Sequence, residues 1–352
     1  MENTTGKPRS SKRKKIVLIL LALLLLAGAA GGYAYYKVVY TRVQMEGTES
    51  YLYIRNNDTY GDVFNQLTEK GFVKHPQLFD ILAERANYPG NVKPGKYKIT
   101  NDMNYIRLIR HLRSGKQEQV KLVINAMITP QELCSLVGTY LDADSIVLAN
   151  MLKDTALLDS NGFNKENILC LFLPDTYNFY WNTSAEDFFK RMLREYAKFW
   201  NSDRRLKAAA QELSPVEVGI LASIVDGESN KADERGIIAG LYLNRLRKGM
   251  LLQADPTVRY ALRATNRQRF YEADTKFDSP YNTYIYTGLP PGPLALPSKQ
   301  SINAVLNPSR HKYLYMCAKE DMSGYHNFTH DYNVHLLNAK RYRLALNKLG
   351  IR

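Results

Sequence analysis

A charge-free run of 21 residues near the start of the chain restricts most strongly what this protein can fold into. Residues 16–36 read IVLILLALLLLAGAAGGYAYY. At about 1.5 Å per residue, a helix of this length is roughly 31 Å long, which is enough to cross the hydrocarbon core of a bilayer. Tyr33, Tyr35 and Tyr36 lie where aromatic side chains gather at a membrane interface. The sequence therefore predicts a single transmembrane helix over residues 16–36.

The charges before this run predict its orientation. Residues 1–15 hold six basic side chains and a single acid, Glu2. Because such basic clusters stay on the cytoplasmic side, we expect residues 1–15 to form a cytoplasmic tail and the rest of the chain to lie outside the cytoplasmic (inner) membrane. A cleaved signal peptide is the alternative, since Ala27-Gly28-Ala29 is typical of a cleavage site. In both cases the body is exported, so nucleic acid is not an expected partner.

Composition narrows the partners and cofactors further. Residues 16–352 carry 42 basic and 33 acidic side chains, so they retain +9 of the formal charge of +14, which suits an anionic partner such as a membrane surface or an acidic polymer. The three cysteines, Cys134, Cys170 and Cys317, are far apart and form no CxxC or Cys/His cluster. We therefore expect unpaired, buried thiols and predict neither a metal nor a cofactor.

Residues 51–126 are predicted to form a small α+β module that follows a polar spacer at 37–50. Alternating and helical hydrophobic spacings, together with turn residues, define its elements. They are a strand at 51–55, a helix from Asp58-Thr59 to about Lys70, a helix at 76–85, a strand at 95–99, a helix at 104–113 and a strand at 118–125. The initial strand–helix–helix–strand order resembles a LysM module.

Residues 127–352 are predicted to form a larger, mixed α/β domain, which makes the whole chain α+β. Thr129-Pro130 and Ser214-Pro215, each followed by a glutamate, are capping boxes that begin helices. The aromatic segment 171–181 is interpreted as a core-lining loop, with a wall of a sugar cleft as the alternative. The later elements are helices at 215–228 and 231–248, an irregular stretch at 250–299, a helix at 299–306, a hairpin of 312–318 with 325–328, and a closing amphipathic helix at 331–348.

The helix at 215–228 carries two acids, and its periodicity separates them. Leu221, Ile224, Val225 and Glu228 fall on one apolar stripe, whereas Asp226 points about 160° away and is expected to be solvated. A carboxyl group at the end of an apolar stripe has a raised pKa, which makes it a proton donor near neutral pH. On spacing alone, Glu228 could equally end the helix and pair with a basic neighbour.

Five segments of the C-terminal third carry a family resemblance. They are ASIVDGES (222–229), LQADPTVRYAL (252–262), SPYNTYIYTGLPPGPLALPS (279–298), INAVLNPSRHKYLYMCA (302–318) and HNF (326–328). In this order they resemble the endolytic murein transglycosylase family, also called MltG or YceG-like. Including the anchor and the LysM-like module, the resemblance covers nearly the whole chain. It implies that 127–352 is a catalytic transglycosylase domain that cleaves nascent peptidoglycan strands, and it makes peptidoglycan synthases a candidate partner.

The resemblance also assigns the catalytic acid. The family writes this segment A-S-[IL]-[VI]-E-[KR]-E-[TS], and its second acid falls on Glu228. Asp226 stands where the first glutamate is usual, and Gly227 stands where a basic residue is common. Leu169 and Cys170 occupy positions where the family often has Glu-Gly, so a role for that upstream acid is not expected here.

The resemblance implies a reaction that breaks the glycosidic bond without consuming water. Glu228 would protonate the oxygen between N-acetylmuramic acid and N-acetylglucosamine and then take the proton of the muramyl 6-hydroxyl. That hydroxyl closes on C1 and leaves a 1,6-anhydro end, and proximity replaces a second activated nucleophile. The candidate substrate-binding residues are Gln253, Asp255, Thr257, Tyr281, Asn282, Thr283 and Tyr284.

Simpler interpretations stay open for several of these residues. Asp255-Pro256-Thr257 could cap a helix, Asn282-Thr283 could serve loop hydrogen bonding, and His326 is a weak candidate that is more typical of a structural histidine. Two other functions also remain. One is a two-carboxylate hydrolase that uses Glu228 with Asp255 or Asp278. The other is a non-catalytic, membrane-anchored protein that binds the cell wall.

Overall fold

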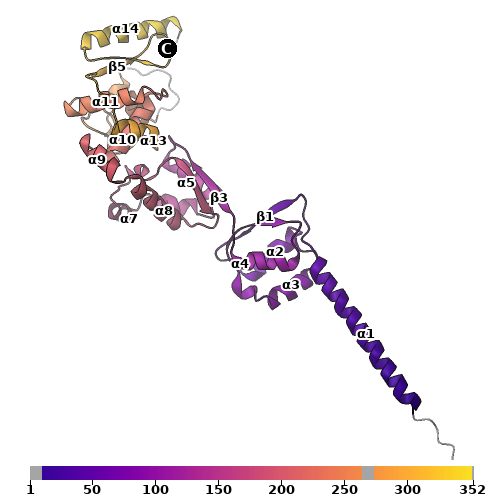
Figure 1. Ribbon diagram of the computed structural model, residues 1–352. Helices are drawn as coiled ribbons and strands as arrows, with labels where there is room; N and C mark the ends of the chain where they lie inside the picture. The colour runs from indigo at the N-terminus through magenta and orange to yellow at the C-terminus, as the bar shows by residue number, and fades with distance from the viewer. Residues whose placement is uncertain (1–9, 264–272, 351–352) are drawn as a thin grey trace, which may run out of the picture. The chain divides into compact units, whose positions relative to one another are not determined.

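The computed structural model describes residues 10–263 and 273–350 (Figure 1). The chain divides into two compact units, Met1–Gln119 with Tyr180–Asn182, and Val120–Phe179 with Thr183–Arg352. Part of the predicted cytoplasmic tail, residues 1–9, lies outside the described residues, and so does 264–272 of the long irregular stretch.

The first unit begins with a long apolar helix, α1 (Ser10–Tyr40). Its segment Lys14–Tyr40 is long and apolar enough to span a bilayer, and no part of its most apolar window is buried within the protein. The helix continues four residues past the predicted end at residue 36. The predicted spacer at 37–50 is therefore partly helical, and its Val43 is buried in the unit that follows.

The rest of the first unit confirms the strand–helix–helix–strand order. Its elements are β1 (Glu49–Ile54), α2 (Tyr60–Glu69), α3 (Pro76–Arg85), a short 3-10 turn η1 (Pro89–Asn91), β2 (Gly95–Thr100) and α4 (Tyr105–Ser114). β1 and β2 pair antiparallel, with Leu52 opposite Tyr97. Thr59 caps α2 through a capping box. Helices α2, α3 and α4 enclose one apolar core together with this two-stranded sheet.

The second unit starts with a sheet of two strands, β3 (Gln119–Ile124) and β4 (Asp175–Tyr180). β3 pairs with β4, and the division between the two units falls at residues 119/120. The helices between and after these strands are α5 (Pro130–Tyr140), α6 (Ser145–Met151), α7 (Thr155–Ser160), the 3-10 turn η2 (Ile168–Leu171) and α8 (Ala185–Phe199). Segment 171–181 lines the core as predicted, but it does so largely as a strand, with Tyr177 and Phe179 facing inward.

The C-terminal half of the second unit is built around α10 (Pro215–Glu228), which packs against α11, α12 and α13. The capping box of Ser214 and Glu217 begins this helix as predicted. The surrounding elements are α9 (Ser202–Ala210), α11 (Arg235–Arg247), α12 (Asp255–Ala261), the 3-10 turn η3 (Asp274–Lys276), α13 (Lys299–Leu306), the antiparallel hairpin β5 (Tyr315–Ala318) and β6 (His326–Thr329), and α14 (Tyr332–Lys348). The predicted hairpin and helices are confirmed within a few residues.

Candidate active site

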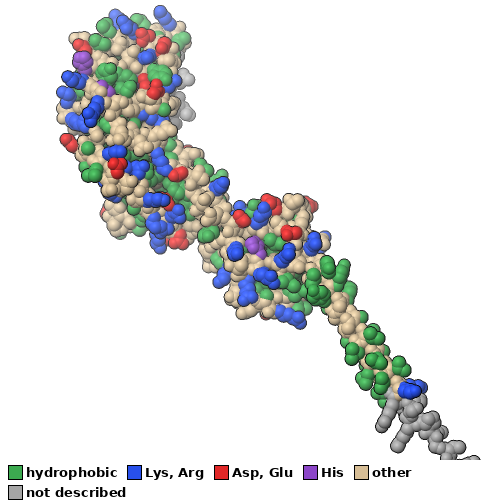
Figure 2. All heavy atoms as spheres, viewed as in Figure 1, with side chains coloured by type: hydrophobic (Ala, Val, Ile, Leu, Met, Phe, Trp, Pro, Cys, Tyr) green, Lys and Arg blue, Asp and Glu red, His purple; other side chains and the backbone are tan. Residues whose placement is uncertain are grey.

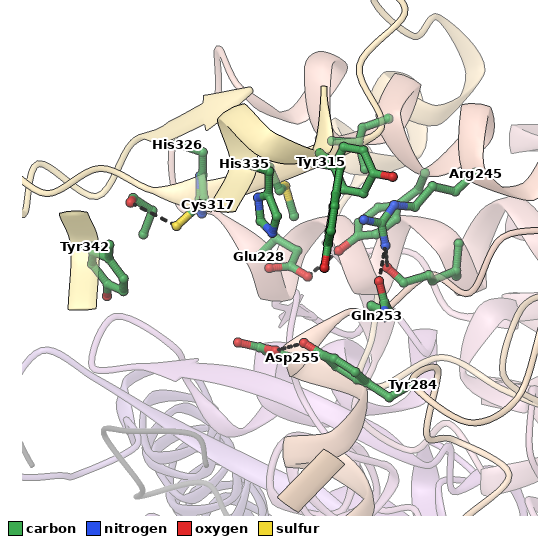
Figure 3. Close-up of a pocket in the computed structure, with 16 residues that line it drawn as sticks. Glu228, Arg245, Gln253, Asp255, Tyr284, Tyr315, Cys317, His326, His335 and Tyr342 are labelled. Atoms are coloured by element: carbon green, nitrogen blue, oxygen red, sulfur yellow. Dashed lines mark hydrogen bonds between the residues drawn. The ribbon is translucent and has the colours of Figure 1, made fainter. Parts of the chain in front are cut away.

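Glu228 is the last residue of α10 and lines a cleft of about 470 Å³ (Figure 3). Unlike the nine consecutive buried residues before Gly227, it is only partly covered, so its carboxyl group reaches the cleft from the end of a buried helix. The periodicity argument placed Glu228 at the end of an apolar stripe, and the structure puts it there. The carboxyl group therefore meets a ligand while most of its surroundings are protein.

The carboxyl group of Glu228 is held in a neutral form. Burial raises the pKa of Glu228 to about 8, and the negative charge of Asp255 acts in the same direction. The hydroxyl of Tyr242 donates a hydrogen bond to Oε1 and opposes this rise, as do the charges of Arg245 and Arg259. Because Oε1 accepts this hydrogen bond, the proton of the neutral carboxyl group belongs on Oε2.

Asp226 is not the solvated acid that the helical wheel suggested. It is 8% exposed, and its carboxylate accepts hydrogen bonds from the Ser298 amide at 2.7 Å, the Ser298 hydroxyl at 2.8 Å and the Ser301 hydroxyl at 2.7 Å. Arg235 lies 3.6 Å away. The wheel failed because residues 218–226 of α10 are buried on every side of the helix, so this part has no polar face. Asp226 instead ties α10 to the start of α13, and Glu228 is the acid at the cleft.

Arg245 lies behind the cleft and joins three parts of its wall. Its guanidinium is buried and donates to the carbonyl oxygens of Leu314 at 2.6 Å, Leu251 at 3.1 Å and Leu252 at 2.8 Å. It also donates to Oε1 of Gln253 at 3.2 Å. Burial lowers the pKa of Arg245. This one cation fixes β5 and the segment before α12 relative to α11.

Three of the predicted substrate-binding residues line the cleft: Gln253, Asp255 and Tyr284 (Figure 3). Gln253 has a φ of 49°, which is a strained backbone conformation. The backbone N–H of Gln253 donates a hydrogen bond to Thr283 O and holds this conformation. Asp255 is the first residue of α12 rather than its cap, which is Ala254. Its carboxylate is instead exposed and accepts a hydrogen bond of 2.5 Å from the Tyr284 hydroxyl.

The other four predicted residues lie behind this wall. The hydroxyls of Thr257 and Thr283 are 2.8 Å apart, and both side chains are buried. The amide of Asn282 is also buried and donates to Thr275 O at 2.9 Å and Phe277 O at 2.6 Å. Tyr281 packs against Tyr260, with ring centroids 4.7 Å apart, and does not line the cleft. These side chains hold the loop that carries Tyr284.

The opposite wall was not predicted from the sequence. It comes from α11, the β5–β6 hairpin and α14, and its side chains include Tyr242, Arg245, Tyr315, Cys317, Tyr332, His335 and Tyr342. Four of these seven side chains are tyrosines. No signal in the sequence separated Arg245 from Arg235 and Arg247 of the same helix.

His326 belongs to this wall and is held by a buried acid. The carboxylate of Glu234, which is 4% exposed, lies 2.9 Å from Nδ1 of His326 and accepts from the His326 amide at 2.7 Å. Ser229, next to Glu228, donates to the same carboxylate at 3.1 Å. Glu234 thus fixes the hairpin to the end of α10. Among the described residues, no group of three or more His, Cys, Asp or Glu is arranged to hold a metal ion.

Gly227 permits the close approach of α12 to the end of α10. A Cβ atom at this position would lie 2.8 Å from Cβ and 3.1 Å from Cγ of Pro256. Gly227→Ala should therefore push α12 and Asp255 away from Glu228, and we expect kcat/KM to fall by about 10²-fold. Overpacking should cost about 1–3 kcal/mol, partly offset by about 1 kcal/mol of helix propensity.

Steady-state kinetics and thermal unfolding check this prediction. Gly61→Ala in helix α2 is the matched control, because the nearest atom to the added Cβ, Thr59 Oγ1, is 3.6 Å away. It should keep kcat/KM near the wild-type value and should not destabilise the protein, because it gains helix propensity without overpacking. A Gly227→Ala variant with wild-type kcat/KM would show that the contact with Pro256 does not position the site.

Comparison with known proteins places the chain in a family. Residues 52–341 match the YceG-like family. A protein of Bacillus subtilis named endolytic murein transglycosylase is 31% identical over 72% of this chain and 74% of its own length. A protein of the same name from Streptococcus pneumoniae is 25% identical over 73% of this chain, which spans about half (52%) of that relative. The crystal structure of a YceG-like protein from Listeria monocytogenes superposes with a TM-score of 0.53 at 25% identity, covering 82% of this chain and 98% of that one. The chain belongs to the YceG-like family.

Proposed function

We propose that this protein is an endolytic lytic transglycosylase that cleaves peptidoglycan glycan strands. The observation that carries the proposal is the carboxyl group of Glu228, which lies at the wall of a cleft with its pKa raised to about 8. A neutral carboxylic acid at physiological pH can donate a proton to a glycosidic oxygen. The relatives named endolytic murein transglycosylase support the same activity and bond class.

Glu228 acts in both halves of the reaction. Its proton passes to the oxygen that bridges C1 of N-acetylmuramic acid and N-acetylglucosamine, and the C1–oxygen bond breaks to leave an oxocarbenium-like state at C1. The carboxylate that remains takes the proton of the muramyl 6-hydroxyl as that oxygen bonds to C1. Glu228 is then protonated again, no water is consumed, and the strand ends in a 1,6-anhydro unit. The raised pKa serves both steps, because the carboxylate of a weak acid is a good base.

The walls of the cleft have separate tasks in this mechanism. Tyr242 holds Oε1 of Glu228, which leaves Oε2 for both proton transfers. Gln253, Asp255 and Tyr284 present amide, carboxylate and aromatic groups to N-acetyl and hydroxyl groups on one side. Tyr315, on the other side, offers a ring face to a sugar. A rigid wall suits the role, because catalytic geometry depends on tight positioning of the substrate.

We infer that the remaining parts of the chain hold this cleft near its substrate. We propose that α1 anchors the protein in the cytoplasmic membrane with its N-terminus inside and both units outside. We further propose that the β1–α2–α3–β2 segment is a LysM-like module that binds glycan. Peptidoglycan synthases, which supply nascent strands at the same membrane, are the expected protein partners.

A two-carboxylate hydrolase is the second candidate, because Asp255 lines the same cleft as Glu228. Asp278, the other acid considered, does not line the cleft, and it accepts a hydrogen bond of 2.7 Å from Tyr286. The carboxylate of Asp255 also accepts from Tyr284, and that contact favours a role in binding over one in activating water. A non-catalytic protein that only binds the cell wall would not need a carboxyl group of raised pKa at the cleft.

The nature of the new strand ends tests the proposed function. Purified protein is incubated with uncrosslinked glycan strands, and the products are analysed by mass spectrometry. We expect internal cleavage with muramyl ends that are lighter than reducing ends by one water. Reducing ends in their place would establish the hydrolase, and intact strands would establish the non-catalytic protein.

A further inference from the structure

A groove between α3 and α4 of the first unit is separate from the catalytic cleft. Its volume is about 320 Å³, and its apolar lining includes Leu82, Ile106 and Ile109. Three arginines, Arg85 of α3 with Arg110 and Arg113 of α4, line it as well. Figure 2 shows Lys and Arg side chains gathered over this part of the first unit. The groove therefore combines an apolar floor with a cationic rim.

Within the part of the chain that the structure describes, the three guanidinium groups of the rim have no partner of opposite charge. Among residues 10–263 and 273–350, none of them forms a hydrogen bond, an ion pair or a ring contact, and all three side chains are exposed. The nearby acids of α3 do not pair with them: Asp80 accepts from the Tyr60 hydroxyl, and Glu84 forms no ion pair with any of the three. Three like charges around one groove repel one another, and a bound anion would relieve this repulsion.

The groove is closely tied to the end of the apolar helix α1. Asn104, the cap of α4, donates to Val39 O at 3.1 Å, and Val43 N donates to Met103 O at 2.9 Å. At about 1.5 Å per residue, Arg113 lies within roughly 14 Å of this cap along α4. The rim is thus a short distance from the point where α1 leaves the hydrocarbon core.

We propose that this groove binds the phosphate headgroup of an anionic phospholipid of the membrane that α1 crosses. The inference rests on the proposed membrane anchoring and is independent of the catalytic chemistry. Arginine matches phosphate oxygens through paired N–H donors, and the apolar floor accepts the glycerol and first methylene groups of the lipid. Binding would fix the first unit against the membrane surface.

A lipid titration of the full-length protein in detergent micelles tests the proposal. The probes are short-chain phosphatidylglycerol, short-chain phosphatidylcholine and inorganic phosphate. We expect phosphatidylglycerol to bind at least about tenfold more tightly than either of the others. With a roughly fivefold contribution from each arginine, the combined variant Arg85→Gln, Arg110→Gln, Arg113→Gln should bind phosphatidylglycerol about a hundredfold more weakly.

The matched control removes the same charge elsewhere on the first unit, through Lys74→Gln, Lys93→Gln and Lys96→Gln, none of which lines the groove. This control should bind the lipid like wild type. Thermal unfolding verifies that both variants fold. If the wild-type protein does not cleave glycan, the proposed function is wrong, but the result of the lipid titration is unaffected.

Three results would overturn the proposal. If the lysine control bound phosphatidylglycerol as weakly as the arginine variant, the loss of affinity would come from net charge and not from the groove. Inorganic phosphate that binds as tightly as phosphatidylglycerol would make the groove a site for free anions. Equal affinity for phosphatidylcholine and phosphatidylglycerol would remove the role of the headgroup charge.

Discussion

Replacing Glu228 with glutamine is expected to lower the rate of glycan cleavage by about 10³-fold or more. A general acid alone contributes about 10²–10⁴-fold, and in the proposed mechanism one carboxyl group performs both proton transfers. Glutamine keeps the shape and can still accept the hydrogen bond from Tyr242, so binding should survive. The measurement is the rate of appearance of new strand ends, with substrate affinity determined separately.

Asp278→Asn serves as the matched control for this variant. It also neutralises a carboxylate, but Asp278 is exposed and does not line the cleft. We expect wild-type rates from it. If Glu228→Gln cleaved strands at a rate within a few-fold of wild type, Glu228 could not be the acid.

The same variant should unfold at a higher temperature at neutral and alkaline pH. The pKa of Glu228 is about 8 in the folded protein and 4.5 ordinarily, so folding takes up a proton between these values. Since the unfolded chain binds fewer protons there, the contribution of Glu228 to stability falls as pH rises from about 4.5 to about 8. Glutamine does not titrate, so the difference in melting temperature between variant and wild type should widen over this window.

Arg245→Leu is expected to destabilise the second unit by about 3–5 kcal/mol. The substitution leaves the carbonyl oxygens of Leu251, Leu252 and Leu314 without their shared donor in a buried setting. Each unsatisfied buried acceptor costs about 1–3 kcal/mol. Removal of the positive charge should also raise the pKa of Glu228, because Arg245 lowers it in the wild type.

Denaturant unfolding and the pH dependence of cleavage measure these two effects. Arg247→Leu is the control, because Arg247 lies two residues further along α11, is exposed, and donates one hydrogen bond of 2.8 Å to Gln211. It should cost less than about 1 kcal/mol. Equal destabilisation by both substitutions would show that the buried contacts of Arg245 are not what holds the cleft wall.

The sequence predicted the elements whose signals are local. Ser214 and Glu217 begin α10 through a capping box, and the apolar spacing that follows placed Glu228 at its end. The sequence could not predict that Asp226 is buried. A helical wheel assumes one polar side, and α10 has none, because α11, α12 and α13 pack around it. A buried acid next to a cleft acid is distinguished only by its partners, Ser298 and Ser301 from a distant segment.

The wall of the cleft shows the same limit. Gln253, Asp255 and Tyr284 lie in or near a recognisable motif and line the cleft, whereas Asn282 and Thr283 of the same motif support it from behind. Residue type could not separate these roles, because a polar side chain can serve either a ligand or a loop. Tyr332, His335 and Tyr342 were missed since the fold of α14 over the cleft has no local signal.

The dependence of kcat/KM on pH in the wild-type protein tests the central claim, that a protonated Glu228 in the free enzyme starts the reaction. The basic limb of this profile reports the pKa of the essential acid in the free enzyme. We predict that kcat/KM falls tenfold per pH unit above a midpoint of about 8. A fall centred near 4.5, the ordinary pKa of a glutamic acid, would contradict the account.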